Sequence, residues 1–412
     1  MAAARRPDRR LAPRPLPLHL ASASLLWLTS RAALMHWRSG WPLLRTPGNI
    51  AEGQLASLAD EIARLGREPV AAALDLQLYG RADAFLTGLD AYRNHPYRRR
   101  AGRIPVLWRG GSARLLDYGE ASAGPAVLIV PSLINRHYIL DLLPGRSFAR
   151  HLAGHGLRPL VLDWGEPGRI ERDFTLSDYT LGPLAAALSA AVEAAGRPVA
   201  ILGYCMGGLL SLAVALHRPA EVTALALLAT PWDFHAAQPE EARLLGLAIE
   251  SLGGMAGPAE PLPVEALQGL FAAVDPFLAE RKFVRFAGLD PASAAARDFV
   301  ALEDWINDGV PLARKVALEC ARSWYRDNDP SSGRWQVAGR VVRPEALDVP
   351  ALVVLPSRDR IVPSGSAGAL AEAIPGAVAL RPASGHIGMM ASAAAPETVW
   401  QPIANWLRDT LA

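Results

Sequence analysis

Continuous apolar runs separated by helix-length segments constrain the fold of this chain more than any other feature. The runs are rich in Val, Leu, Ile and Ala, and they lack the polar alternation of a strand with one solvated face. They are AVLIVP (126–131), LRPLVLDW (157–164), PVAILGY (198–204), VTALALLAT (222–230), PALVVLP (350–356) and AVALRP (377–382). Because such strands alternate with helical segments, the sequence predicts an α/β fold with a mostly parallel central sheet covered by helices.

This strand pattern divides the chain into regions. Residues 1–100 lack it and are expected to form an N-terminal helical region with a disordered start rich in Pro, Arg and Ala. Residues 101–232 and 346–412 contain the strands and are expected to form the α/β core. Residues 233–345 contain no clear buried strand. We predict that they insert as a helical cap over the carboxyl edge of the sheet, where the sites of α/β proteins lie.

The composition narrows the class of function. The 412 residues carry a formal net charge of +2, which gives no global indication of a nucleic-acid partner. Two cysteines, Cys205 and Cys320, are too few for a disulfide framework and favour a reducing compartment in which a thiol stays free. The sequence contains neither a metal-ligand spacing nor a Gly-rich phosphate loop. We therefore expect a cytoplasmic protein with no metal and no bound cofactor.

An apolar stretch, residues 16–37, follows the N-terminal arginines and has two interpretations. Arg31 and His36 interrupt it, and a transmembrane span needs about 20 predominantly apolar residues, so we expect no span. A secretory signal peptide is one interpretation, because small residues are frequent. The favoured one is an amphipathic helix that lies on an apolar surface or packs onto the domain.

The segment Gly203-Tyr204-Cys205-Met206-Gly207 places a thiol between a buried strand and a helix. The pattern Gly-x-nucleophile-x-Gly is that of a nucleophile elbow, a turn so sharp that side chains at the two glycine positions would crowd its neighbours. The middle residue is exposed at the helix N-terminus, where the helix dipole favours a thiolate. Cys205 is therefore the candidate nucleophile, with a buried cysteine in a Gly-rich turn as the structural alternative.

An acid and a histidine follow in the order that the elbow fold requires. Asp359 comes shortly after the strand 350–356, and His386 follows the strand 377–382. We expect His386 to take the proton of Cys205, and Asp359 to fix the tautomer of the imidazole. Taken singly, each has a structural alternative, as a loop carboxylate or a surface histidine. Together they predict a catalytic triad.

The elbow also predicts an oxyanion hole and favours one kind of chemistry. One donor is the backbone N–H of Met206, and the second is the N–H of Ser132 or Leu133, in the loop after the strand 126–131. An acyl group on Cys205 is a thioester, so its transfer from an acyl-CoA is nearly isoenergetic and keeps the group activated. The thiol thus favours transfer to a second acceptor, although water attacks thioesters too.

Several motifs carry a family resemblance. They are GYCMGG around Cys205, LIVPSLINRHYILDL (128–142), VLDWGEPG (161–168), DWINDGVP (304–311), SRDRIVP (357–363) and SGHIG (384–388). With them the chain resembles the polyhydroxyalkanoate synthases, which polymerise hydroxyacyl-CoA on an α/β-hydrolase scaffold. The resemblance implies a triad of Cys205, His386 and Asp359, a mobile cap, hydroxyacyl-CoA substrates, a homodimer, and a cytoplasmic location at polyester granules.

Three functions from different classes remain open at this point. The favoured one is an acyltransferase that polymerises hydroxyacyl-CoA through an acyl thioester on Cys205. The second is a Cys-dependent hydrolase on the same scaffold, either a thioesterase or a polyester-mobilising esterase. The third is a non-enzymatic granule protein anchored by the N-terminal apolar helix. The product distinguishes the first two, because a synthase makes insoluble polyester and a hydrolase makes free acid.

Overall fold

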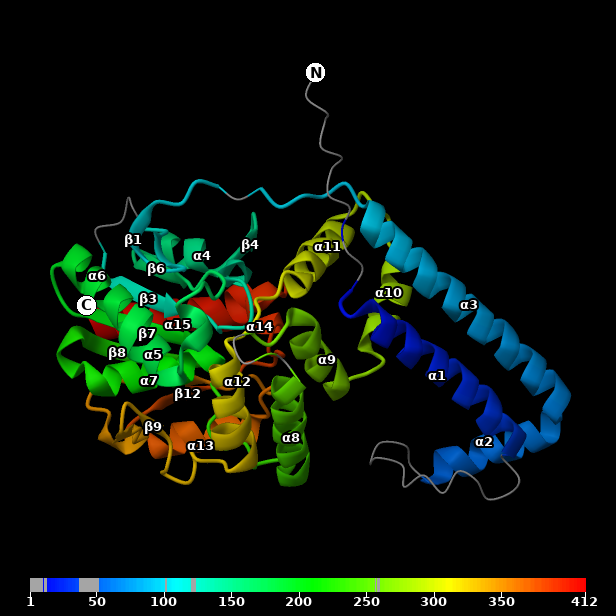
Figure 1. Cartoon of the computed structure of the whole chain (residues 1–412). Coiled ribbons are helices and arrows are strands. Elements are labelled where there is room, and N and C mark those ends of the chain that lie inside the picture. The colour runs from blue at the N-terminus through cyan, green and yellow to red at the C-terminus, as the bar shows by residue number, and fades with distance from the viewer. Residues whose placement is uncertain are drawn as a thin grey trace. The chain divides into compact units, whose positions relative to one another are not determined.

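The computed structural model describes residues 10, 13–36, 52–100, 102–119, 124–255, 257 and 260–412. The described chain forms two compact units. One comprises residues up to Tyr97 together with Asp275–Glu303, and the other comprises Arg98–Val274 and Asp304–Ala412. We call them the N-terminal unit and the α/β unit. Figure 1 labels their elements.

An eight-stranded sheet forms the centre of the α/β unit, in the order β1-β2-β6-β3-β7-β8-β11-β12. The pairs β1–β2 and β2–β6 are antiparallel, and the other neighbours are parallel. The predicted α/β class with a mostly parallel sheet is therefore confirmed. The strands are β1 (Val106–Gly110), β2 (Ala113–Asp117), β3 (Ala126–Val130), β6 (Arg158–Asp163), β7 (Val199–Tyr204), β8 (Val222–Leu228), β11 (Ala351–Val354) and β12 (Val378–Leu380).

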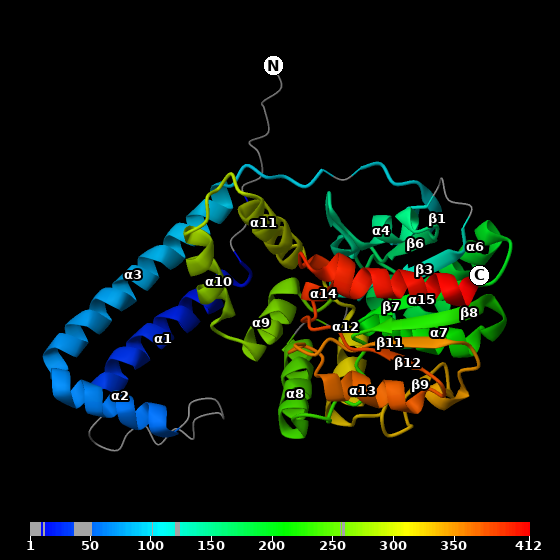
Figure 2. The ribbon, with the colours of Figure 1, turned by 180° about the vertical axis from the view of Figure 1, so that it is seen from behind.

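Helices cover both faces of this sheet. Figure 1 shows α5, α6 and α7 in front of the strands, and Figure 2, from behind, shows α4 and α15 in front of them. Every side chain of β3 and β7 is buried, as the continuous apolar runs require. The helices of the core are α4 (Phe148–Gly154), α5 (Leu176–Tyr179), α6 (Ala185–Ala195), α7 (Met206–His217), α13 (Ser364–Ala373), α14 (Gly388–Ala391) and α15 (Gln401–Leu411).

The predicted insertion 233–345 is mainly helical but does not form one unit. Its segment Asp275–Glu303 groups with the N-terminal unit, and its remaining residues group with the α/β unit. The two units therefore divide the chain differently from the expected regions. The physical reason is that Phe283 and Phe286 of α10 belong to a buried cluster with Phe85 of α3. The helices of the insertion are α8 (Pro239–Met255), α9 (Val264–Val274), α10 (Leu278–Ala287), α11 (Ala294–Asn307), α12 (Arg314–Glu319) and the π-helix η5 (Cys320–Arg326); short strands β9 (Gln336–Val337) and β10 (Arg340–Val341) follow.

The N-terminal unit is held by packing of α3 (Arg67–Asn94) against α10. Phe85 and Phe283 are fully buried with their ring centroids 6.4 Å apart, and the buried Glu280 accepts from Arg81 Nε at 2.9 Å. The other described helices of this unit are α1 (Leu16–His36) and α2 (Glu52–Leu65). The predicted disordered start falls mostly on residues 1–9, 11 and 12, which lie outside the described residues.

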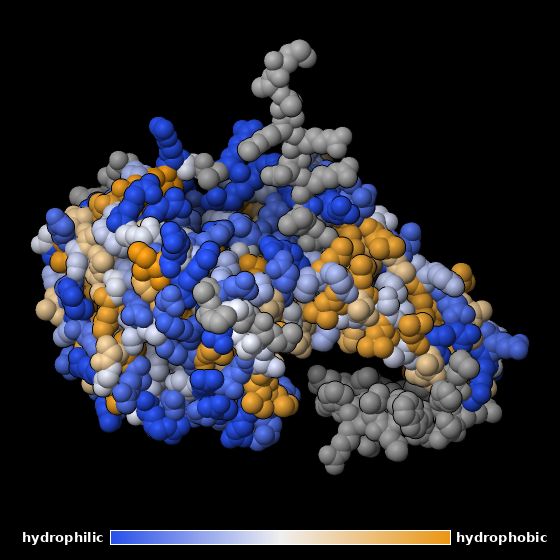
Figure 3. Space-filling view, in the orientation of Figure 1, coloured by the Kyte–Doolittle hydropathy of each residue, from blue (hydrophilic) through white to orange (hydrophobic). Residues whose placement is uncertain are grey.

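Helix α1 packs on one side through Ala23, whereas Leu25 and Leu28, which share another face, are 59% and 71% exposed. Leu76 and Tyr79 of α3 are also exposed, and Figure 3 shows hydrophobic surface gathered over this unit. No helix among the described residues combines the length and the apolar character needed to cross a bilayer.

Candidate active site

Cys205 occupies a strained turn between a strand and a helix. β7 ends at Tyr204 and α7 begins at Met206, so Cys205 is the residue between them, with φ 55° and ψ −125°. A non-glycine residue at such angles costs about 1–3 kcal/mol and persists only where its surroundings hold it. Here the N–H of Cys205 donates to the carbonyl of Leu228, at the end of β8, at 2.8 Å. The turn therefore has the backbone geometry of a nucleophile elbow.

The glycines of the elbow are needed because backbone segments approach closely there. A Cβ on Gly203 would lie 2.4 Å from the Cα of Gly208, and one on Gly207 would lie 2.2 Å from the carbonyl oxygen of Val130. A Cβ on Gly208 would lie 1.9 Å from Oγ1 of Thr230. Real Cβ atoms do not come within 3.0 Å of such neighbours. The crowding expected at Gly203 and Gly207 is thus present, and Gly208 is subject to it too.

Asp359 and His386 form a buried hydrogen-bonded pair. Nδ1 of His386 lies 2.7 Å from Oδ2 of Asp359, and each residue is 8% exposed. The other carboxylate oxygen accepts the N–H groups of Ile361 at 2.8 Å and Val362 at 2.9 Å. Because both oxygens of Asp359 are held, the carboxylate fixes the orientation of the His386 ring.

Cys205 lies close enough to His386 to affect the pKa of the imidazole. Burial of the His386 ring opposes its protonation. The negative charge of Cys205 and the hydrogen bonds with Asp359 and Cys205 outweigh burial and raise the pKa of His386 from 6.5 to about 10. The structure thus brings Cys205 close to the His386–Asp359 pair, and the surroundings of His386 favour its protonated form.

Tyr204 is a neighbour of His386 that the sequence analysis did not identify. Its ring stacks on the ring of His386, with centroids 5.2 Å apart and planes inclined by 27°. Its hydroxyl donates to the backbone carbonyl of His386 at 3.1 Å. The position directly before the nucleophile was the only sequence signal available, because the contact joins residues 182 positions apart.

The predicted oxyanion donors begin at two adjacent strand ends. The N–H of Met206 lies in the first turn of α7, where helical N–H groups have no partner within the helix. Val130 of β3 pairs with Gly203 of β7, so the loop that continues to Ser132 and Leu133 starts beside the elbow. Both residues are buried, and Oγ of Ser132 has no hydrogen-bond partner in the described part of the protein.

The second cysteine, Cys320, is buried in η5. Burial, and to a lesser degree the charge of the nearby Glu319, raises the pKa of its thiol well above the ordinary value, so Cys320 is a poor nucleophile. Among the residues that the structure describes, no group of three or more His, Cys, Asp or Glu side chains could hold a metal ion. The reactive thiol of this chain is therefore expected at Cys205.

Comparison with known families places this geometry in context. Residues 125–393 match the family described as alpha/beta hydrolase fold. The chain belongs to this family. A solved structure of this alpha/beta hydrolase fold, BpoC from Mycobacterium tuberculosis H37Rv, superposes with a TM-score of 0.50 at 17% identity, covering 77% of this chain and 100% of that one. At that identity the superposition supports the fold alone.

Curated relatives narrow the comparison within the alpha/beta hydrolases. The chain is 28% identical over 322 residues to the poly(3-hydroxyalkanoate) polymerase subunit PhaC of Haloferax mediterranei, an alignment that covers 75% of this chain and 64% of the relative, less than two thirds of its length. The PhaC of Allochromatium vinosum is 29% identical over 302 residues, covering 71% of this chain and 83% of that one. The resemblance to polyhydroxyalkanoate synthases predicted from the motifs is confirmed by these relatives.

Proposed function

We propose that this chain is an acyltransferase that polymerises hydroxyacyl-CoA thioesters into polyhydroxyalkanoate through an acyl thioester on Cys205. The observation that carries the proposal is the placement of Cys205 at a strained elbow against the buried His386–Asp359 pair. Curated relatives named poly(3-hydroxyalkanoate) polymerases supply the reaction class. The proposed substrate is a hydroxyacyl-CoA, and no bound cofactor takes part.

The acylation step follows from the charges of the site. His386 takes the proton of Cys205, and the thiolate attacks the carbonyl carbon of the incoming thioester. The N–H of Met206 and an N–H from Ser132 or Leu133 stabilise the negative charge on the carbonyl oxygen. The C–S bond to CoA then breaks, and the CoA thiolate leaves with the proton held by His386. Asp359 stabilises the imidazolium throughout.

Chain growth uses the same residues on a second substrate. His386 takes the proton of the hydroxyl group that attacks the acyl-Cys205 thioester. The new ester bond forms as the bond to sulfur breaks, and the proton on His386 balances the charge of the released thiolate. Because a thioester is less stable than the oxygen ester that replaces it, this transfer is favourable.

The location and partners of the protein are part of the proposal. We expect the chain to act as a homodimer in the cytoplasm, at the surface of the polyester. The exposed apolar side chains Leu25, Leu28, Leu76 and Tyr79 of the N-terminal unit support a contact with an apolar polymer, because exposed apolar surface that gathers in one region often marks an interaction site.

The test is incubation of the purified chain with hydroxybutyryl-CoA, followed by measurement of released CoA and identification of the product. We expect insoluble polyester, no CoA release by Cys205→Ala, and a rate lowered ~10²–10⁴-fold by His386→Ala, the typical contribution of a general base. Free hydroxybutyrate as the main product would instead identify a hydrolase. Acylated protein that accumulates in Cys205→Ala would overturn the assignment of the nucleophile.

A further inference from the structure

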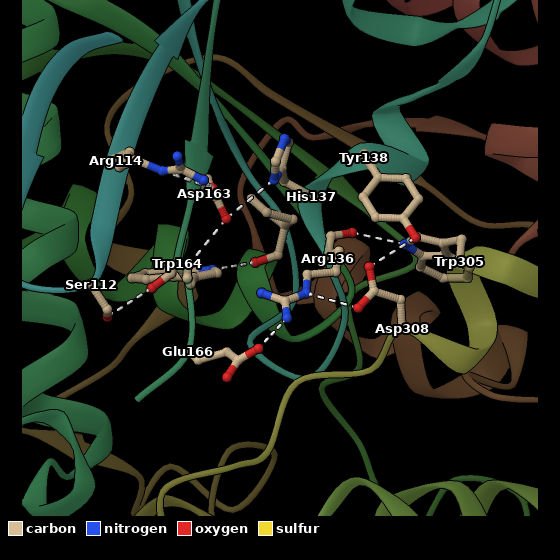
Figure 4. Close-up of polar contacts among 12 residues, drawn as sticks. Ser112, Arg114, Arg136, His137, Tyr138, Asp163, Trp164, Glu166, Trp305 and Asp308 are labelled. Carbon is tan, nitrogen blue, oxygen red and sulfur yellow. Dashed lines mark hydrogen bonds and ion pairs between the residues drawn. The ribbon is translucent and has the colours of Figure 1, made fainter. Parts of the chain in front are cut away.

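The loop of residues 131–136, here called the oxyanion loop, is anchored at both ends by tryptophan side chains. At its start, Nε1 of Trp164 donates to the carbonyl of Pro131 at 3.0 Å. At its end, Nε1 of Trp305 donates to the carbonyl of Arg136 at 2.8 Å. Figure 4 shows the two indoles on opposite sides of the Arg136 backbone. Both tryptophans are buried, at 5% and 3% exposure, so these hydrogen bonds are protected from water.

Between these ends, the loop is also bound by the segment that contains Trp305. The carbonyl of Ile134 accepts the N–H of Val310 at 3.0 Å, and Asn135 forms a bridge with Gly309. The loop carbonyls thus accept hydrogen bonds from two segments. One contains Trp164, which directly follows β6, and the other is residues 305–310, within the helical insertion. These two segments lie in the motifs VLDWGEPG and DWINDGVP. Their role in the fold is to hold the loop that follows β3.

A set of charged side chains reinforces the second anchor. Arg136 forms ion pairs with Glu166 and, through Nε at 3.3 Å, with Asp308 (Figure 4). The hydroxyl of Tyr138 donates to the other oxygen of Asp308 at 3.0 Å. Asp308 therefore joins the residues just after the oxyanion loop to the segment that contains Trp305.

We infer that Trp305 and Asp308 are positioning residues for acyl transfer, because they set the place of the oxyanion loop beside Cys205. The inference rests on the proposed function and goes beyond it in assigning residues that touch no reacting atom. The loop starts beside the elbow, where the carbonyls of Val130 and Pro131 approach Gly207. The buried Oγ of Ser132 has no partner among the described residues, as expected of a group whose partner arrives with a substrate.

The size of the effect follows from the chemistry. An oxyanion donor must lie within about 3 Å of the developing charge, and loss of one such donor costs ~10²–10³-fold in rate. A displacement of about 1 Å by a distant substitution costs up to ~10²-fold. Loss of the Trp305 hydrogen bond is therefore expected to slow acylation by ~10–100-fold. The His386–Asp359 pair does not involve this loop, so the reactivity of the Cys205 thiol toward an alkylating agent should not change.

The experiment compares two reactions of the same thiol in Trp305→Phe, which keeps an aromatic ring but removes the indole N–H. Acylation is followed as a burst of p-nitrophenol from p-nitrophenyl acetate and as CoA release from hydroxybutyryl-CoA. Alkylation by iodoacetamide, which needs the thiolate but no oxyanion hole, is measured as a function of pH. We expect slower acylation by both donors and an unchanged alkylation profile.

Trp324→Phe is the matched control, because Trp324 is also 3% exposed but its Nε1 has no hydrogen-bond partner in the described structure. It should leave both reactions at the wild-type rate. If Trp305→Phe does not fold, Asp308→Asn is the second variant, because the Asp308 side chain is 47% exposed. Asp308→Asn should slow acylation several-fold.

Acylation of folded Trp305→Phe at the wild-type rate would overturn the inference. A parallel loss of acylation and alkylation would do the same, because it would indicate general damage to the site. A wild-type chain that is acylated by the nitrophenyl ester but not by hydroxybutyryl-CoA would contradict the proposed substrate. The ester data alone would then support or refute the positioning role.

Discussion

The ring of Tyr204 stacks on the ring of His386, and its hydroxyl binds the backbone carbonyl of the same residue. Tyr204, the residue before the nucleophile, therefore orients His386, the proposed base. Its ring fills the space beside the imidazole. The hydrogen bond from its hydroxyl fixes the loop that contains His386, independently of Asp359, so the ring is held from two sides.

Substitution at Tyr204 should separate these two contacts. Tyr204→Phe keeps the stacked ring and should lower the acylation rate of Cys205 only a few-fold, whereas Tyr204→Leu loses the stacking and should lower it by ~10-fold or more, as expected when a catalytic group is misplaced. The pH profile of Cys205 alkylation is the second measurement, and it should shift in Tyr204→Leu alone. Equal effects of the two variants on both measurements would contradict a role for the ring.

Removal of the Asp359 charge should change how the protein responds to pH. The pKa of His386 is raised from 6.5 to about 10 in the folded protein, with burial opposing the shift and Cys205 and Asp359 favouring it. This stabilisation is complete below pH 6.5, where the unfolded chain also binds the proton, and it is lost as pH rises toward 10. In Asp359→Asn the pKa of His386 should fall, because one of the two favourable charges is gone.

Urea unfolding at pH 6, 8 and 9.5 checks this sign. The wild type should exceed Asp359→Asn in free energy of unfolding by ~1–3 kcal/mol at pH 6, the usual cost of breaking a buried hydrogen bond to a charged group. The gap should narrow toward pH 9.5. A gap that widens with pH would show that His386 is neutral in the folded protein.

Close packing at Gly208 predicts a loss of both stability and activity in Gly208→Ala. The added Cβ would meet Oγ1 of the fully buried Thr230 at 1.9 Å, so the start of α7 must shift away from the segment that follows β8 and move Cys205. We expect destabilisation by ~1–3 kcal/mol, as for other overpacked cores, and loss of acylation. Gly368→Ala is the control, because Gly368 is a buried residue of α13 with nothing within 4 Å of the added atom. It should be neutral or stabilising in thermal unfolding and leave acylation unchanged.

Two glycines of α3 in the N-terminal unit, Gly88 and Gly80, provide a second variant and its control within one helix. In Gly88→Ala of α3 the new Cβ would lie 2.1 Å from the backbone oxygen of Phe283 in α10, so the two helices must separate. We expect ~1–3 kcal/mol of destabilisation. Gly80→Ala, with no atom within 4 Å, should instead stabilise the helix by up to ~1 kcal/mol. Amide hydrogen exchange in α3 and α10 measures both effects, and faster exchange in Gly80→Ala would contradict the prediction.

Much of the site could be predicted because parallel strands share a common carboxyl edge. Cys205, Asp359 and His386 each follow a different apolar run, so the α/β pattern alone places them at the same edge. The family resemblance, confirmed by the curated relatives, rests on motifs at these strand ends. The grouping of α10 with α3 was not predicted, because α10 shows an apolar face but nothing local to it indicates which distant helix packs against it.

The sequence by itself determined the strand pattern, the glycines of the elbow and the order of the three triad candidates, because periodicity, turn geometry and strand order are properties of neighbouring residues. Only the tertiary structure decided that Tyr204 supports His386, and that Trp164 and Trp305 hold the loop after β3. Those contacts join side chains to carbonyls that are at least 33 residues away along the chain. An N–H group carries no local signal of which distant carbonyl it will bind, so packing alone selects its partner.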